Sequence, residues 1–186
     1  MVDNLHIGFS GACSVGKTTL INALAGEYPQ FNIQRESVRY LKDKYNFSFH
    51  DAGTALQMAL LHMQTKLLYE QGLHMLDRVS LDSMAFVRYY RDRGESDLNI
   101  SAYQYILDES KKNMEKIDLI IYLKPEFPII PDGIRIADDK YQKETDAIFE
   151  KLIKEWNLED KVIRPTGTVV ERVNFCKKYI DGLLKN

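Results

Sequence analysis

Short apolar runs alternate along this chain with longer segments in which apolar residues recur at helical spacing. The short runs predict strands buried on both faces of a sheet, and the periodic segments predict helices. Strands are expected at residues 5–9, 31–35, 73–76, 119–123 and 161–164. Because a helical segment separates each strand from the next, the pattern predicts an α/β fold with a five-stranded parallel sheet.

The periodic segments place helices between these strands. Helices are expected from the end of a glycine-rich run to residue 26, after residue 54, and over residues 82–90, 101–113, 141–156 and 169–184. Two of them begin with a pattern typical of a capping box, Thr54 followed by Gln57 and Ser101 followed by Gln104. In that motif the first side chain would accept a hydrogen bond from the backbone of the first helical turn.

Composition limits the class of protein. The chain has 186 residues, 45% of them hydrophobic, and a net charge of −2, so we expect one domain, residues 1–186, without a general basic field. Apolar runs are too short for a bilayer span. Cys13 and Cys176 form no disulfide framework, which predicts a cytoplasmic protein with reduced thiols. His62 and His74 lie in apolar neighbourhoods and are expected to be packed rather than to bind zinc.

A glycine-rich segment joins the first strand to the first helix. It reads Gly11-Ala12-Cys13-Ser14-Val15-Gly16-Lys17-Thr18, followed by Thr19. This is the phosphate-binding pattern G-x-x-x-x-G-K-[ST], in which backbone N–H groups surround an anion at a helix N-terminus. Lys17 would carry a positive charge to the outer phosphates, and the Thr18 hydroxyl would bind Mg²⁺. The segment therefore predicts a site for ATP and Mg²⁺.

Further charged residues follow the third strand. In parallel sheets, ligands bind beyond the carboxyl ends of the strands, so side chains at these ends are candidates for chemistry. Asp77 is expected to associate with Mg²⁺, the Walker B role, and Arg78 to contact phosphates. Asp82 either contacts substrate or caps the next helix.

The remaining candidates follow the second and fourth strands. Glu36 is the best candidate to accept a proton from a substrate hydroxyl, with Asp77 as the alternative. Arg39 lies one helical turn beyond Glu36 and would orient it or contact substrate. Residues 128–143 follow a proline-rich turn and are expected to form a lid over the phosphates, with Arg135 as its main cation.

Together these features resemble the P-loop nucleoside and nucleotide kinases, especially the nicotinamide riboside kinase-like branch, with thymidylate and deoxynucleoside kinases more distant. The resemblance covers nearly the whole chain. It implies a three-layer P-loop NTPase fold with the Asp77 strand beside the phosphate-loop strand. It also implies ATP and Mg²⁺ as cofactors and γ-phosphoryl transfer to a small acceptor. Ser37 stands where thymidylate kinases have proline, and the lid has few arginines, so a neutral hydroxyl acceptor is favoured over a monophosphate.

Three functions remain open from the sequence. The favoured one is a kinase for a nucleoside, nucleotide or similar small molecule. The second is a kinase for a hydroxyl of a modified base in DNA, for which Arg88, Arg91 and Arg93 form the local basic cluster. The third is a nucleotide-dependent switch or ATPase without a small acceptor. No membrane partner is expected, and a homodimer is left open.

Overall fold

The computed structural model describes residues 2–35, 40–41, 44–45, 53–127 and 138–185. Five strands form one sheet in the order β2-β3-β1-β4-β5, and every neighbouring pair is parallel. The strands are β1 (Asn4–Ser10), β2 (Asn32–Gln34), β3 (Gly72–Asp77), β4 (Leu119–Tyr122) and β5 (Val162–Ile163). The predicted five-stranded parallel sheet is confirmed, and β3 lies directly beside β1, as the resemblance implied.

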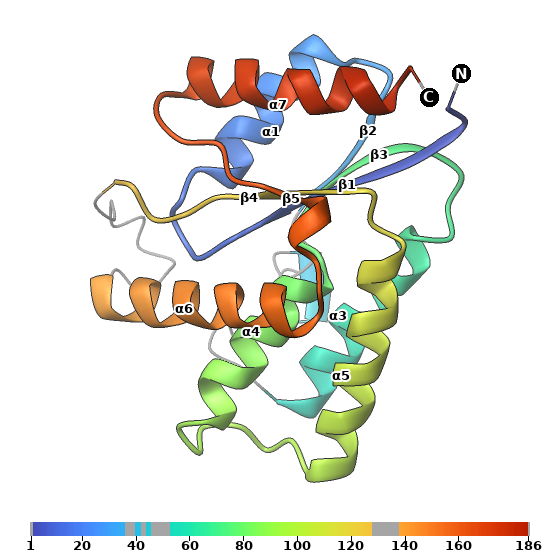
Figure 1. The fold of residues 1–186 in the computed structure, drawn as a ribbon. Helices are drawn as coiled ribbons and strands as arrows, with labels where there is room; N and C mark the ends of the chain where they lie inside the picture. The colour runs from blue at the N-terminus through green and yellow to red at the C-terminus, as the bar shows by residue number, and fades with distance from the viewer. Residues whose placement is uncertain (1, 36–39, 42–43, 46–52, 128–137, 186) are drawn as a thin grey trace.

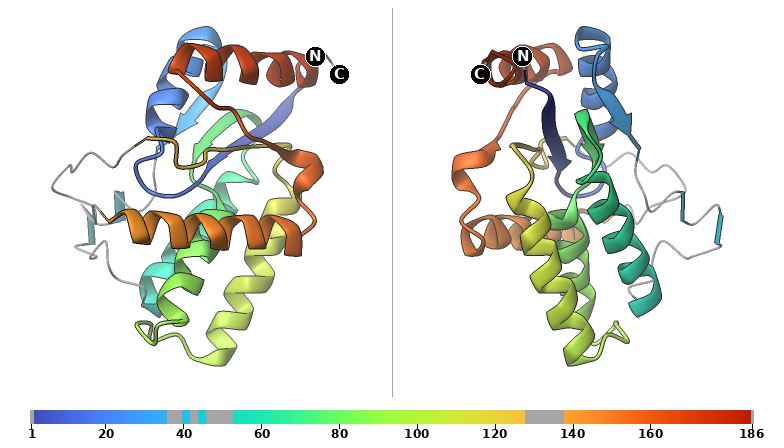
Figure 2. Two further views of the ribbon diagram at one scale, coloured as in Figure 1. Left: turned by 60° about the vertical axis from the view of Figure 1, so that its left-hand side comes forward. Right: turned by 90° about the vertical axis from the view of Figure 1, so that its right-hand side faces the viewer.

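Helices cover both faces of the sheet and make the three layers that were expected. They are α1 (Lys17–Glu27), α3 (Thr54–Leu67), α4 (Ser80–Arg91), α5 (Ile100–Glu115), α6 (Asp139–Glu155) and α7 (Val169–Leu183). Helices α1 and α7 lie on one side, and α3, α4, α5 and α6 lie on the other (Figure 1, Figure 2). Among the described helices, none combines the length and apolar character that crossing a bilayer requires.

Each face of the sheet has its own hydrophobic core. Along β4, Leu119 and Ile121 pack into the cluster under α1 and α7, whereas Ile120 and Tyr122 pack into the cluster under α4 and α6. All four side chains are almost fully buried. This two-residue alternation, buried on both sides, explains why the strand reads as a continuous apolar run in the sequence.

The predicted capping box at Thr54 is wrong. The N-cap of α3 is Gly53, and Thr54 is the first helical residue. The backbone N–H and the hydroxyl of Thr54 instead donate to Oδ1 of Asp97, at 2.7 and 3.1 Å. A carboxylate from a distant loop therefore accepts a hydrogen bond from the free N–H group at the start of the helix. Gln57 does not cap the helix and is buried instead.

The capping box predicted at Ser101 is also wrong. The helix α5 begins earlier, because Asn99 is its N-cap and accepts a hydrogen bond from the Ala102 N–H at 2.9 Å. Asparagine caps a helix as well as serine does, so the sequence holds two candidate N-caps, two residues apart, for one helix start. A true capping box occurs at α7, where Thr168 and Glu171 satisfy each other's backbone N–H groups.

Two histidines stack between adjacent strands of the sheet. His6 on β1 and His74 on β3 are register partners, with ring centroids 5.2 Å apart and both side chains buried. The expectation that His74 is packed is confirmed. His62 is exposed on α3, so the same expectation for His62 is wrong. A helix can carry one polar position on an otherwise apolar stretch simply by turning it outward.

Candidate functional site

The phosphate-binding pattern forms the turn between β1 and α1. Gly11, Ser14 and Gly16 all have positive φ angles, of 138°, 60° and 90°. A Cβ atom on Gly11 would lie 2.3 Å from the backbone oxygen of Leu123, so only glycine fits there. Gly16 is the N-cap of α1 and has no side chain to cap it. The helix therefore directs its uncapped N-terminus, with its partial positive charge, into the loop.

Lys17 lies folded against this loop. Its Nζ donates to the backbone oxygens of Gly11 at 2.8 Å and Ala12 at 2.6 Å. The side chain is 5% exposed. Burial lowers the pKa of Lys17 to about 8, and the nearby positive charge of Arg78 acts in the same direction. The ammonium is thus held close to the loop, where an anion would gain strongly from its charge.

Asp77 is the last residue of β3, the strand next to β1, and its side chain contacts the end of the phosphate loop. The Thr18 hydroxyl donates to Oδ2 of Asp77 at 2.9 Å. A hydroxyl and a carboxylate side by side are oxygen ligands that suit Mg²⁺. The described residues contain no cluster of three His, Cys, Asp or Glu that would hold an ion alone. Such a pair still fits Mg²⁺, which usually takes its remaining ligands from phosphates and water.

Arg78 contacts both the phosphate loop and the start of α4. Its guanidinium donates to Oδ1 of Asp82 at 2.9 Å and to the backbone oxygen of Gly11 at 3.4 Å. It also lies 5.1 Å from the ring centre of Phe86. The backbone of Arg78 has a φ of 79°, which costs a residue with a side chain on the order of 1 kcal/mol. Such strain at a candidate site is consistent with a function for the arginine.

Asp82 is buried between β1 and the start of α4. It is 1% exposed and accepts hydrogen bonds from the Ser10 hydroxyl at 2.7 Å, from Arg78 and from the Val79 N–H at 3.3 Å. Burial raises the pKa of Asp82, against the opposing effect of Arg78 and Lys17. These contacts favour the capping alternative over substrate contact, and they make Asp82 the residue that orients Arg78.

A pocket opens beside Asp77 and Arg78. Both residues line it, together with Gln34 at the end of β2 and Gln64 on α3. Leucines at the end of α3 and on β3 form part of its wall. The side-chain oxygen of Gln64, Oε1, accepts hydrogen bonds from the hydroxyls of Ser80 and Ser83 in α4. Sequence reasoning missed Gln34 and Gln64. The available signal was Gln64 itself, a polar residue four positions after Leu60 on an apolar helix face.

The remaining predicted side chains cannot be placed in this site from their contacts. Glu36, Arg39 and Arg135 lie outside the described residues, as does the 128–137 part of the expected lid. Residues 138–143 form the N-cap and first turn of α6. Of the predicted set, the structure therefore brings together the phosphate loop, Asp77, Arg78 and Asp82.

Two buried residues that no motif marks also contact the phosphate loop. Gln142, in the first turn of α6, donates from Nε2 to the backbone oxygen of Cys13 at 2.8 Å. Arg172, in the first turn of α7, donates from Nη1 to the backbone oxygen of Val15 at 2.9 Å. Both side chains are 4% exposed. They come from segments more than 100 residues away, so no local pattern could have indicated them.

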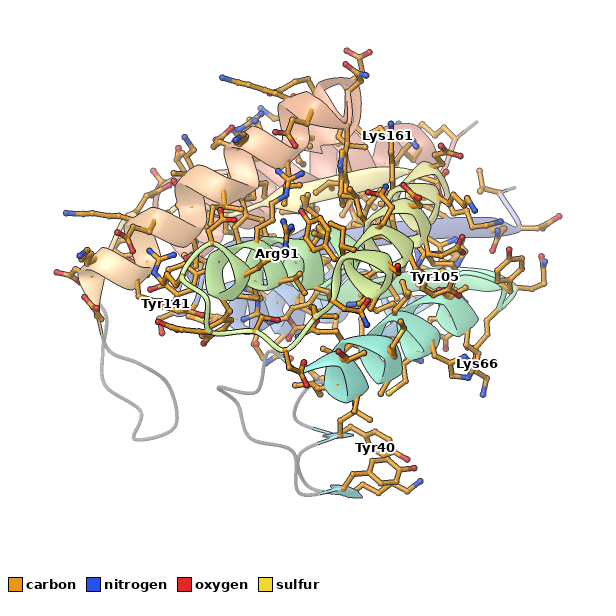
Figure 3. All side chains as sticks on the ribbon, turned by 90° about the horizontal axis from the view of Figure 1, so that it is seen from below. Tyr40, Lys66, Arg91, Tyr105, Tyr141 and Lys161 are labelled. Atoms are coloured by element: carbon orange, nitrogen blue, oxygen red, sulfur yellow. The ribbon has the colours of Figure 1, made fainter. Side chains whose placement is uncertain are left out.

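The basic cluster in and just after α4 makes contacts within the molecule. Arg88 pairs with Glu155 at 2.6 Å, and Arg93 pairs with Glu144. The Arg91 guanidinium lies 3.9 Å from the ring centre of Tyr103. Figure 3, which views the molecule from below, labels Arg91. Each arginine of the cluster already has an acidic or aromatic partner.

The sequence matches the family described as AAA domain over residues 6–172. A comparison with curated proteins gave no match. Similar solved structures include the NadR protein in complex with NR, with 19% identity and a TM-score of 0.72, covering 95% of this chain and 51% of that chain. The chain thus spans about half the length of that NadR chain.

Two kinases resemble this chain over nearly their whole length. Deoxyadenosine kinase from M. mycoides with bound dCTP has 16% identity and a TM-score of 0.69, covering 96% of this chain and 100% of that chain. Thymidylate kinase from Candida albicans has 13% identity and a TM-score of 0.66, covering 97% and 92%. At these identities the likeness concerns the fold. The chain belongs to the AAA-domain family, and its fold is that of the P-loop nucleoside and nucleotide kinases.

Proposed function

We propose that this protein is an ATP- and Mg²⁺-dependent kinase that transfers the γ-phosphoryl group to a nucleoside, a nucleotide or a similar small molecule. One observation carries the proposal. The phosphate loop, the Thr18–Asp77 pair and Arg78 converge at the carboxyl ends of β1 and β3, and Asp77 and Arg78 also line the adjacent pocket. A donor in the loop and an acceptor in the pocket would therefore meet at a shared wall.

Each residue of the proposed site has a role set by its chemistry. Lys17 and Arg78 would stabilise negative charge on the phosphoryl oxygens, and Arg135 would add to this from the lid. Thr18 and Asp77 would hold Mg²⁺, which when bound neutralises charge on the β- and γ-phosphates. Asp82 would keep Arg78 in place through their 2.9 Å ion pair.

The proposed step joins an acceptor oxygen to the γ-phosphorus. As that bond forms, the bond from the γ-phosphorus to the β,γ-bridging oxygen breaks, and ADP leaves. A hydroxyl acceptor gives its proton to a carboxylate. Because Thr18 already engages one oxygen of Asp77, we favour Glu36 as this base, with Arg39 orienting it.

The residues that line the small pocket are of both apolar and polar types. They include leucines together with Gln34 and Gln64, a mixed lining that would suit an acceptor carrying both apolar and hydrogen-bonding groups. The arginines that DNA binding would need are paired within the molecule. The deoxyadenosine and thymidylate kinases of the same fold are named for acceptors of this class.

The direct test is ADP release from ATP and Mg²⁺ across a panel of nucleosides and nucleoside monophosphates. We expect at least one acceptor to stimulate release, and Lys17→Ala to abolish the stimulation. Lys66→Ala, which removes an exposed lysine on α3, is the matched control and should behave as the wild-type protein does. Intact ATP binding with no acceptor-dependent release would contradict the kinase and support a nucleotide switch.

A further inference from the structure

The backbone oxygens of the phosphate loop are bonded by side chains from several elements. Lys17 bonds those of Gly11 and Ala12, Gln142 bonds that of Cys13, and Arg172 bonds that of Val15. In a trans peptide unit the C=O and the next N–H point in opposite directions. A carbonyl held outward therefore turns the following N–H inward, which is the orientation that phosphate oxygens require.

Gln142 is fixed by its surroundings as well as by its own hydrogen bond. Its neighbour Tyr141 packs edge-on against Tyr89, with ring centroids 4.7 Å apart, and stacks on Phe86 at 6.4 Å. Figure 3 shows Tyr141 at the beginning of α6. Because Tyr89 and Phe86 belong to α4, these contacts hold the start of α6 in place. Gln142 is thus presented to Cys13 from a rigid support rather than from a free helix end.

Arg172 has more donors than its surroundings use. Its Nη1 bonds Val15, whereas Nε and Nη2 have no hydrogen-bond partner among the described residues, although the side chain is buried. Nη2 lies 3.4 Å from Oε2 of Glu126, and the same oxygen accepts a hydrogen bond from the Gly167 N–H at 2.9 Å. Glu126 therefore forms an ion pair with Arg172, and the guanidinium also lies 5.3 Å from the ring centre of Phe127. Burying a guanidinium whose donors are not all hydrogen-bonded is costly, so packing alone does not account for an arginine here.

We propose that Gln142 and Arg172 are positioning residues for the phosphate groups of the nucleotide. Each holds one peptide unit of the loop so that the Ser14 N–H and the Gly16 N–H face the anion. Arg172 also brings a positive charge close to the loop. The inference rests on the proposed binding of ATP, and it assigns to α6 and α7 a direct part in that binding.

The test compares binding of the non-hydrolysable analogue AMP-PNP and of inorganic tripolyphosphate, both with Mg²⁺, by calorimetry. Arg172→Ala should weaken both about tenfold, because a charged hydrogen bond is lost. Gln142→Met keeps the side-chain volume, removes the donor and should weaken both about fivefold. Arg172→Lys should restore part of the affinity. Arg88→Ala removes an arginine that is paired with Glu155 away from the loop, and it should bind as wild type does.

The possible outcomes separate this inference from the proposed function. If the wild-type protein binds neither probe, both fail. If it binds and the folded variants bind equally well, the inference alone fails. A loss confined to AMP-PNP would also overturn it, because the residues would then act on the nucleoside part. Melting temperatures identify a variant that does not fold. In that case Gln142→Met and Arg172→Lys, which should each bind more weakly than wild type, decide the question.

Discussion

At the scale of single residues, Asp77 connects the two parts of the proposed site. It accepts the Thr18 hydroxyl on the side of the phosphate loop, and it lines the pocket on the other side. Its position at the last residue of β3 gives it both neighbours, because β3 lies between β1 and β2 in the sheet. A residue at the same place on an edge strand would face only one of them.

Asp77→Asn should weaken the binding of Mg²⁺ at the nucleotide site. The amide has nearly the same size but no negative charge, so the Mg²⁺ concentration needed for half-maximal AMP-PNP binding should rise about 100-fold. The measurement is an AMP-PNP titration at a series of Mg²⁺ concentrations. Asp118→Asn is the control, because Asp118 accepts the His6 N–H at the other end of the strands, at 2.8 Å. An unchanged Mg²⁺ requirement in Asp77→Asn would exclude the metal role.

At the scale of elements, a contact from a distant loop satisfies the start of α3. The carboxylate of Asp97 lies at the N-terminus of α3 and bonds both the backbone and the side chain of Thr54. A negative charge at this position also interacts favourably with the helix dipole. The helix that carries Gln64 into the pocket is therefore anchored by the loop that follows α4.

Asp97→Ala should destabilise the protein by about 1 kcal/mol, since loss of a helix cap has this typical cost. For a chain of this size the melting temperature should fall by about 2–4 °C. Asp92→Ala is the comparison, because Asp92 is an exposed aspartate at the C-terminal end of α4. Equal melting temperatures for the two variants would show that the Asp97 contact contributes nothing.

At the scale of the whole molecule, the two ends of the sheet differ in chemistry. The candidate site lies at the carboxyl ends of β1 and β3, whereas the stacked pair of His6 and His74 lies nearer their amino ends. Within the described residues, His6 Nε2 and His74 Nδ1 have no hydrogen-bond partner. Burial lowers the pKa of His6, His74 adds to this effect, and Asp118 opposes it.

The lowered pKa of His6 predicts a loss of stability in mild acid. Below a pH of about 6.5, the ordinary pKa of histidine in an unfolded chain, the unfolded chain binds a proton that folded His6 does not. The free energy of unfolding therefore decreases as the pH is lowered. The slope should be at most about 1.4 kcal/mol per pH unit, and it should flatten once folded His6 also protonates. Urea unfolding between pH 5 and 7.5 measures this.

Two variants provide the comparison for this prediction. His6→Leu cannot be protonated and should show a weaker dependence on pH. His62→Gln removes an exposed histidine and should retain the wild-type dependence. If His6→Leu followed the wild-type curve, the acid sensitivity would have another source.

Where the determining interactions are local, the sequence alone was sufficient. The alternation of apolar runs and periodic segments predicted all five strands and the helices between them. Burial of a helix or strand face makes apolar residues recur at short, characteristic intervals in the sequence. The phosphate loop was predictable for the same reason, since its glycines, Lys17 and Thr18 are contiguous. Asp77 and Arg78 followed from their place after a buried strand.

Only the tertiary structure decided how distant groups combine. The contacts of Gln142 and Arg172 with the loop, of Asp97 with α3 and of Gln64 with α4 each join residues well separated in sequence. They depend on which helix packs on which face, and that packing leaves no periodic signal. The burial of Asp82 belongs partly to the same class, because the Ser10 hydroxyl that bonds it comes from β1, 72 residues away in the sequence, whereas its ion pair with Arg78 is local.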